Sequence, residues 1–121
     1  MNSSSKTGSI GEERAATFLK DSGYVLLKQN YRLPWGEVDL IARDKSALVF
    51  CEVKTWNTYS EENLERAVGK KKQKKIVSVA KYFLKQNPEY EKDRIRFDVI
   101  LLQDHMSRIK HIKNAFGVDY G

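Results

Sequence analysis

The sequence has few of the features that mark secreted or membrane proteins. Its 121 residues include one cysteine, Cys51, so no internal disulfide can form and we expect a reducing compartment, the cytoplasm. The longest uninterrupted apolar run is Ala47 to Cys51, far short of the ~20 residues that cross a bilayer. The first eight residues lack the apolar stretch of a secretory signal. These absences argue against a secreted, disulfide-stabilised or transmembrane protein.

The composition is that of an ordinary globular domain. Hydrophobic residues make up 40% of the chain and charged residues 31%, and the length suits one domain with its own core. No internal repeat or low-complexity linker is visible. The first eight residues, with three serines and a glycine, are predicted to be flexible, which leaves a domain over residues 9–121.

Positive charge is concentrated in the second half of the chain. Residues 1–60 hold eight Lys/Arg and seven Asp/Glu, a net +1, whereas residues 61–121 hold fourteen and nine, a net +5. Five of those lysines lie between Lys70 and Lys75. Such a segment favours a polyanionic partner, nucleic acid first, although it also fits a merely solvated surface.

Hydrophobic periodicity predicts the first four elements. Residues 10–22 form an amphipathic helix that Gly23 ends, and residues 24–27 form a strand that leads into a loop through residues 34–36. Residues 37–43 and 47–54 have strand character and are separated by three polar residues, which predicts a hairpin.

The second half of the chain begins as a helical segment. Residues 60–68 have helical character with Ser60 as N-cap, and residues 70–86 form a longer helix that Asn87 and Pro88 terminate. Residues 95–102 then form a strand, with a last short strand over residues 108–112. This order predicts an α/β fold in which helices flank a mixed central sheet.

The predicted hairpin carries charges where half-buried strands do not need them. Glu37 and Asp39 share one face of the first strand, while Val38 and Leu40 point to the other. Glu52 and Lys54 likewise share a face of the second strand. If the strands pair, three carboxylates and one ammonium meet, which is what a Mg²⁺ or Mn²⁺ site for phosphodiester hydrolysis requires.

A simpler interpretation is a cross-strand ion pair on a solvated face, worth only ~0.2–1 kcal/mol. The occurrence of Glu37 and Asp39 on one strand with Glu52 and Lys54 on the next favours a metal site over a surface ion pair. Glu52 also follows a nearly all-apolar run typical of a central strand covered on both sides.

At these residues the chain resembles a known group of proteins. Asp39 followed by Glu52-Val53-Lys54 is similar to the Asp…Glu-x-Lys core of the restriction-endonuclease-like nucleases, which include archaeal Holliday-junction resolvases. The chain resembles more closely the YraN family, small bacterial proteins of uncharacterised function with that fold. The resemblance spans Gly11 to Phe116 and rests on Gly11-Glu12, Asn30-Tyr31-Arg32, Gly36 to Ala42, Leu48 to Thr55, Ala67-Val68 with Lys70, Arg96 to Val99, and His111 to Phe116.

The resemblance implies a role for each matching residue. Asp39 and Glu52 would be metal ligands, and Lys54 would position the attacking water. Glu12 matches an acidic residue that resolvase-like relatives add to the same metal site, although stabilisation of the helix dipole explains an acid there equally well. Glu37 matches a family residue outside the minimal nuclease core, and we rank it lower as a catalytic candidate.

A lysine-rich track and nearby aromatic residues are candidates for nucleic-acid binding. The lysines predicted to contact a phosphate backbone are Lys70, Lys71, Lys74, Lys75 and Lys81, with a solvated helix face as the alternative. Trp35, Tyr31 and Trp56 could stack on splayed bases, or Trp35 could pack on the sheet edge and Tyr31 on the core.

Four other polar side chains are interpreted without a catalytic role. Cys51 is predicted to be a small core residue, His105 an exposed turn residue, and His111 a hydrogen-bonded strand residue. Asp98 matches a family residue, and this match implies either structural work in its strand or support of a neighbouring site residue.

The leading hypothesis is therefore a Mg²⁺- or Mn²⁺-dependent nuclease that acts on DNA, with branched or single-stranded forms as substrates. DNA is favoured over RNA, no membrane is involved, and a homodimer would supply two active sites for symmetric cutting. Two alternatives stay open: a non-catalytic nucleic-acid-binding module with the nuclease fold, and a protein-interaction domain whose basic helix binds an acidic partner.

Overall fold

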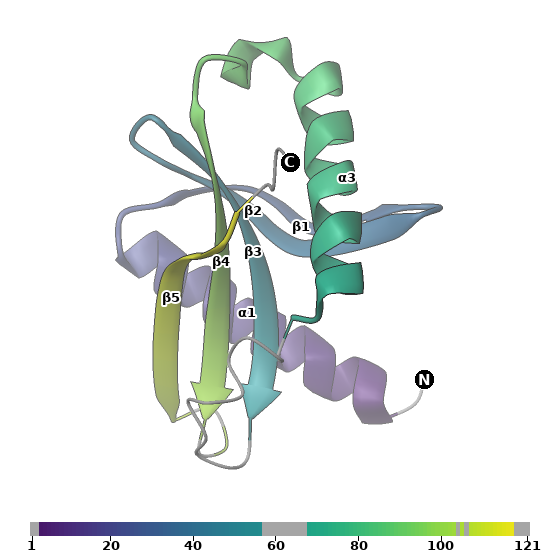
Figure 1. Cartoon of the computed structure of the whole chain (residues 1–121). Helices are drawn as coiled ribbons and strands as arrows, with labels where there is room; N and C mark the ends of the chain where they lie inside the picture. The colour runs from purple at the N-terminus through teal and green to yellow at the C-terminus, as the bar shows by residue number, and fades with distance from the viewer. Residues whose placement is uncertain (1–2, 57–67, 104, 106, 118–121) are drawn as a thin grey trace.

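The computed structural model describes residues 3–56, 68–103, 105 and 107–117, with only the backbone described for residues 3–9 and for Trp56. The chain runs through α1 (Ser3–Asp21), β1 (Val25–Leu33), β2 (Gly36–Asp44), β3 (Ala47–Trp56), α3 (Lys70–Gln86), the short 3₁₀ helix η2 (Pro88–Tyr90), β4 (Arg94–Gln103) and β5 (Arg108–Phe116) (Figure 1).

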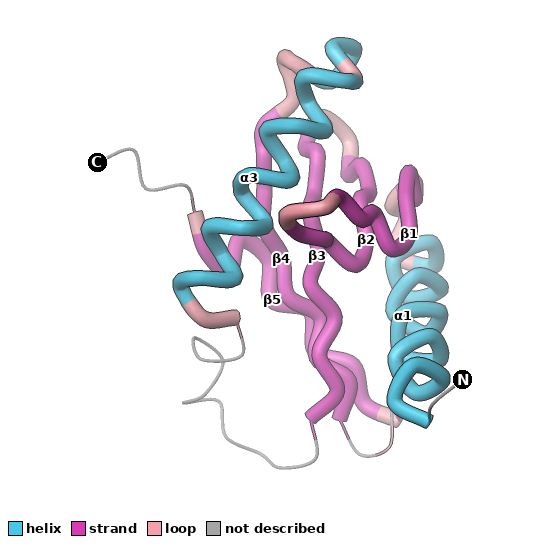
Figure 2. The backbone as a smooth tube through the Cα atoms, turned by 90° about the vertical axis from the view of Figure 1, so that its right-hand side faces the viewer, coloured by secondary structure: helices cyan, strands magenta, loops and turns pink. Residues whose placement is uncertain are grey.

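The five strands form one mixed sheet in the order β1-β2-β3-β4-β5. β3 and β4 are parallel, from Ala47 opposite Arg94 to Trp56 opposite Gln103, and the other neighbouring strands are antiparallel. Figure 2 shows α1 and α3 on opposite sides of the strands, so the described part of the chain has three layers. The predicted α/β class and mixed sheet are confirmed, and the arrangement is consistent with a restriction-endonuclease-like fold.

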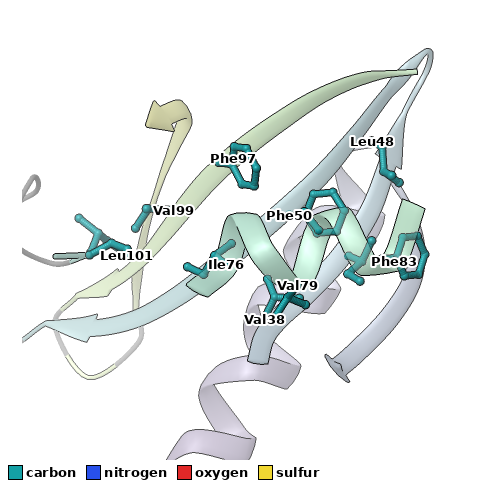
Figure 3. Packing of buried hydrophobic residues seen from close by; sticks show 12 residues of the cluster. Val38, Leu48, Phe50, Ile76, Val79, Phe83, Phe97, Val99 and Leu101 are labelled. Carbon is teal, nitrogen blue, oxygen red and sulfur yellow. The ribbon is translucent and has the colours of Figure 1, made fainter. Parts of the chain in front are cut away.

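β3 is the central strand and is covered on both faces, as its apolar sequence predicts. Leu48 and Phe50 belong to the core beneath α3, which includes Ile76, Val79 and Phe83 of that helix (Figure 3). The alternate residues Val49 and Cys51 belong to the core beneath α1, which includes Ala15, Ala16 and Leu19. Glu52 and Lys54 continue the α3-facing series, so the sheet directs them toward that helix.

The alternation predicted for β2 is wrong at one point. Val38 belongs to the core beneath α3 and lies beside Val79, whereas Leu40 belongs to the core beneath α1 (Figure 3). β1, its partner strand, contains a register shift between Leu26 and Lys28 and a positive φ of 51° at Asn30. Such irregularities bend and twist a hairpin, so residues two apart do not keep to one side of the sheet.

Several element boundaries differ from those predicted. α1 begins at Ser3, seven residues earlier than predicted, β1 extends to Leu33 instead of ending at residue 27, and β5 continues to Phe116. The predicted range of α3 matches, and Asn87 caps it with a hydrogen bond from Nδ2 to the Phe83 carbonyl oxygen at 2.8 Å. The helical segment predicted from Ser60 lies outside the described residues except for Val68, and whether the first eight residues are flexible stays a prediction.

None of the helices in the described ranges is both long enough and apolar enough to span a membrane.

Candidate active site

Asp39 and Glu52 are brought together where the β2–β3 pairing ends. The antiparallel ladder runs from Asp44 opposite Ala47 to Leu40 opposite Cys51. Beyond it, the backbone N–H of Val53 donates to Asp39 Oδ2 at 2.8 Å. The Asp39 carboxylate thus takes the place of a backbone acceptor, and this bond fixes it beside the next residues of β3.

Glu52 is a buried carboxylate with only half of its hydrogen-bonding capacity used. Its side chain is 4% exposed, and Oε1 accepts a hydrogen bond from Lys72 Nζ of α3 at 2.6 Å. Oε2 is buried and accepts no hydrogen bond from the described residues, and the Glu52 carboxyl lies within hydrogen-bonding reach of the Asp39 carboxyl. A buried, unpaired carboxylate oxygen is costly and calls for a ligand.

The surroundings make the charge on Glu52 unfavourable. Burial, followed by the negative charge of Asp39, raises the pKa of Glu52 to about 7, against the opposing effect of Lys72. A bound cation would remove the repulsion between the two carboxylates.

Lys54 and Lys72 supply positive charge next to this carboxylate pair. Burial, reinforced by the charge of Lys72, lowers the pKa of Lys54. Burial also acts to lower the pKa of Lys72, but the hydrogen bond and charge of Glu52 outweigh it and the net pKa is raised. Of the two, Lys54 is therefore the lysine that gives up its proton more readily.

Glu12 approaches the same region from α1. A Cβ on its neighbour Gly11 would lie 3.2 Å from Leu102 Cδ1 and 3.5 Å from Thr55 Oγ1, so glycine lets the helix lie close against the ends of β3 and β4. Burial raises the pKa of Glu12, with an added contribution from the charge of Asp39. Asp39 therefore interacts electrostatically with both Glu12 and Glu52.

Glu37 is an exposed side chain, unlike the buried Glu52, although its negative charge still contributes to raising the pKa of Glu12. It forms a salt bridge to Arg32 at 3.1 Å across the β1–β2 hairpin, and its side chain is 53% exposed. Among the described residues, no three His, Cys, Asp or Glu side chains are grouped closely enough to hold one metal ion. The structure thus assembles Asp39 and Glu52 as a pair, with Glu12 adjacent to Asp39 and Glu37 in a separate ion pair.

The donor set at Asp39 and Glu52 nevertheless fits a hard divalent cation. Carboxylate oxygens are the ligands that Mg²⁺ and Mn²⁺ prefer, and Mg²⁺ commonly takes only one or two protein carboxylates and completes its shell with water and phosphate. The unpartnered Oε2 of Glu52 offers one such oxygen.

Lys72 is the site residue that sequence reasoning missed. The lysines selected from the sequence were those on the outer helix face, whereas Lys72 precedes Ile76 by four residues and Val79 by seven, so it shares their buried face. This helical spacing is visible in the sequence. It does not distinguish Lys72 clearly, because Lys72 stands in a run where every neighbour but Gln73 is also lysine.

The five lysines predicted to bind nucleic acid are exposed but divide between two sides of α3. Lys71 and Lys75 line a cavity of about 700 Å³ between α3 and the turn joining β1 to β2, which Lys72 also lines. Lys70, Lys74 and Lys81 line a second cavity of about 630 Å³ on the other side of the helix, next to Gly117. Lys70 therefore does not line the cavity that Lys72 shares, and contact of these lysines with DNA stays a prediction.

The residues interpreted as structural are confirmed in that role. Asp98 is fully buried, with Arg96 Nη2 and His111 Nε2 at 2.9 and 2.7 Å from its Oδ2 and the Asn114 amide donating to its Oδ1. Cys51 is fully buried, and burial raises the pKa of its thiol.

The aromatic residues proposed to stack on bases differ in their exposure. Tyr31 packs edge-on against Phe83 of the core at a centroid distance of 5.4 Å. Trp35 packs edge-on against Tyr82 of α3 at 5.3 Å but remains 46% exposed. The side chain of Trp56 lies outside the described residues.

Comparison with known proteins identifies what the chain is similar to. The model of "Uncharacterised protein family UPF0102" matches residues 11–102. A UPF0102 protein of Treponema denticola is 42% identical over 93% of this chain and 96% of its own length. The UPF0102 protein of Desulfosudis oleivorans is 40% identical over 96% of this chain and 94% of its own length. That of Syntrophus aciditrophicus is 39% identical over 100% of this chain and 96% of its own length. The match range includes Asp39, Glu52, Lys54 and Lys72.

Proposed function

The chain belongs to the UPF0102 (YraN) family, and from its candidate active site we propose that it is a metal-dependent nuclease that hydrolyses phosphodiester bonds in DNA. One observation carries the proposal: Glu52 is buried beside Asp39 with one oxygen unpartnered. A purely structural carboxylate at this position would have both oxygens satisfied.

Asp39 and Glu52 would hold a Mg²⁺ or Mn²⁺ ion. Glu12, which interacts electrostatically with Asp39, would either be a further ligand of the ion or hold a water molecule bound to it. The bound ion would supply Lewis-acid activation of the phosphate and of a water molecule. Asp39 is fixed for this role by the Val53 amide, so one ligand oxygen is oriented before any ion arrives.

Lys54 and Lys72 would handle the proton and the added negative charge. The lowered pKa of Lys54 suits it to accept a proton from the attacking water at Nζ. Lys72 retains its proton, and an ammonium held beside Glu52 can stabilise negative charge on the phosphate as the water attacks. Glu37 is exposed and paired with Arg32, so we rank it below Asp39, Glu52 and Lys54 as a catalytic candidate.

The exposed lysines of α3 support nucleic acid as the substrate. Lys71 and Lys75 lie along the same cavity as Lys72, so a backbone bound there is led to the carboxylate pair. DNA with branched or single-stranded character is the substrate class we propose, within the cytoplasm, and a homodimer would place two active sites on a branched molecule.

The Glu52–Lys72 ion pair favours one alternative. A lysine that already neutralises Glu52 would suit a non-catalytic DNA-binding module in which the pair is structural. That module would bind DNA through the α3 lysines without any dependence on Glu52.

Cleavage of branched and linear DNA in the presence of Mn²⁺ separates the two. For a nuclease we expect Glu52→Gln and Asp39→Asn to lower the rate by about 100-fold or more, and Lys54→Ala to lower it as well. Glu91→Gln, at an exposed glutamate beyond η2, is the matched control and should cut like the unchanged protein. Equal behaviour of all four variants and the unchanged protein would contradict catalysis at this site.

A further inference from the structure

The cavity between α3 and the β1–β2 turn has a composition that the cleavage chemistry does not require. Its cations are Arg32, Lys71, Lys72 and Lys75, against the single carboxylate of Glu37. Arg32 is paired with Glu37 and Lys72 with Glu52, whereas Lys71 and Lys75 are exposed. The same cavity is lined by an aromatic residue, Trp35.

Both walls of this cavity are fixed in place. A Cβ on Gly36 would lie 3.2 Å from Val79 Cγ2 and 3.5 Å from Lys75 Cβ, so the turn is packed directly on α3. Figures 1 and 2 both show the end of the β1–β2 hairpin beside this helix. Trp35 is held at the turn by its edge-on contact with Tyr82, and it still exposes 46% of its surface.

From this arrangement we propose that the cavity between α3 and the β1–β2 turn binds unpaired nucleotides of a DNA strand, with Trp35 as the stacking platform for a base and Lys71 and Lys75 as phosphate contacts. Aromatic platforms beside a basic groove are the means by which proteins hold single strands, because every base presents a π-face. The volume of about 700 Å³ is within the ~300–1,000 Å³ typical of ligand pockets.

A paired base cannot use this site. Its faces are covered by its neighbours in the duplex, and stacking on Trp35 requires that it leave the helix. The inference rests on the proposed function and narrows it. Lys72 lines the cavity and contacts Glu52. A DNA strand held in the cavity would therefore present its backbone to Asp39 and Glu52 at a nucleotide whose base is unpaired.

Binding experiments without cleavage test this site. The chain has two tryptophans, so a Trp56→Phe background leaves Trp35 as the only indole. With EDTA present to prevent cutting, a labelled oligothymidylate and a labelled blunt duplex made of two annealed strands are titrated while Trp35 emission and label anisotropy are recorded.

We expect the oligothymidylate to quench Trp35 emission more strongly than the duplex does. Trp35→Ala should weaken its binding about 10-fold to 100-fold, and Trp35→Phe, which keeps an aromatic ring, should weaken it only a few-fold. Circular dichroism melting confirms that each variant is folded, and Trp35→Phe is the matched control that keeps the ring and the charge of the cavity.

The possible failures are distinguishable from one another. Oligothymidylate binding with unchanged Trp35 emission, equal quenching by the duplex, or an unaltered affinity of folded Trp35→Ala overturns this site and leaves the nuclease proposal standing. Absence of binding to either DNA overturns this site, and the Mn²⁺ cleavage experiment decides separately on the nuclease proposal.

Discussion

At the scale of single residues, Glu52 lies in surroundings that destabilise its ionised form. Its carboxylate is buried, Asp39 lies beside it, and only Oε1 has a partner. Lys72 provides partial compensation from a side chain that is itself 39% exposed. A residue in these surroundings lowers the stability of the folded protein whenever it is ionised, which is the physical cost that the proposed metal ligand would carry.

This cost predicts how stability depends on pH. The pKa of Glu52 rises from its ordinary value of 4.5 to about 7 in the folded protein. Between these values the unfolded chain loses the proton while the folded chain keeps it, so stability falls as pH rises through this interval and is constant above it. Below pH 4.5 the side chain is protonated in both states and the penalty disappears.

Denaturation with urea at a series of pH values measures the penalty. Relative to Glu52→Gln, which never ionises, the unchanged protein should lose about 3 kcal/mol of unfolding free energy between about pH 4.5 and 8. Glu91→Gln removes an exposed carboxylate and should show no such trend relative to the unchanged protein. A difference between unchanged protein and Glu52→Gln that stays constant with pH would contradict the burial of an ionisable Glu52.

At the scale of elements, α3 combines packing on the sheet, a contact with the candidate site and exposed positive charge. Ile76, Val79, Ala80 and Phe83 pack on the sheet, Lys72 reaches Glu52, and the exposed lysines lie along cavities on both sides. If both sides contact phosphates, DNA bound to the protein meets the helix along two lines of charge. A merely solvated helix would give no dependence of binding on these side chains.

The salt dependence of DNA binding distinguishes these cases. Each phosphate contact to single-stranded DNA contributes about 0.7 to the slope of log K against log salt concentration. Lys71→Ala/Lys75→Ala and Lys74→Ala/Lys81→Ala should each reduce the magnitude of that slope by about 1.4. Lys92→Ala/Lys113→Ala, at two exposed lysines outside both cavities, should leave it unchanged; equal slopes in all three double variants would contradict a lysine track on α3.

The predictability of these elements from sequence follows from what fixes each of them. The range of α3 was predicted because its amphipathic period is regular and Asn87-Pro88 ends it. β1 was predicted too short, because residues 28–32 are largely polar and gain their strand conformation from pairing with β2. The prediction that Val38 and Leu40 share one face of the sheet was wrong. The twist of a hairpin depends on the partner strand, and a period-two pattern in one strand does not contain that information.

The site was predictable to a similar extent. Asp39, Glu52 and Lys54 stand out from sequence, because charges follow a strand that is apolar on both faces. The pairing of Glu37 with Arg32 was not predictable, because it depends on the hairpin register. Lys72 reaches Glu52 only through the docking of α3 on β3, a tertiary relation that the helical period hints at but does not determine.

At the scale of the whole molecule, the net charge of +6 divides into two regions that the fold brings into contact. The near-neutral first half contributes the carboxylates of α1, β2 and β3, and the basic second half contributes α3, which packs on the face of the sheet opposite to α1 (Figure 2). Lys72 is the point at which the two regions meet. The acidic pair would repel DNA unless a cation were bound, whereas the surrounding lysines would attract it, so the proposed function needs a divalent ion between the two regions.

The most direct test of this account is a crystal structure of the protein grown with Mn²⁺, with the metal located by its anomalous scattering. We expect a Mn²⁺ ion bound by Asp39 and Glu52, with Glu52 Oε2 as a ligand. A fully ordered site without Mn²⁺ at a saturating concentration, with the Glu52–Lys72 bond intact and Oε2 satisfied by water, would contradict it.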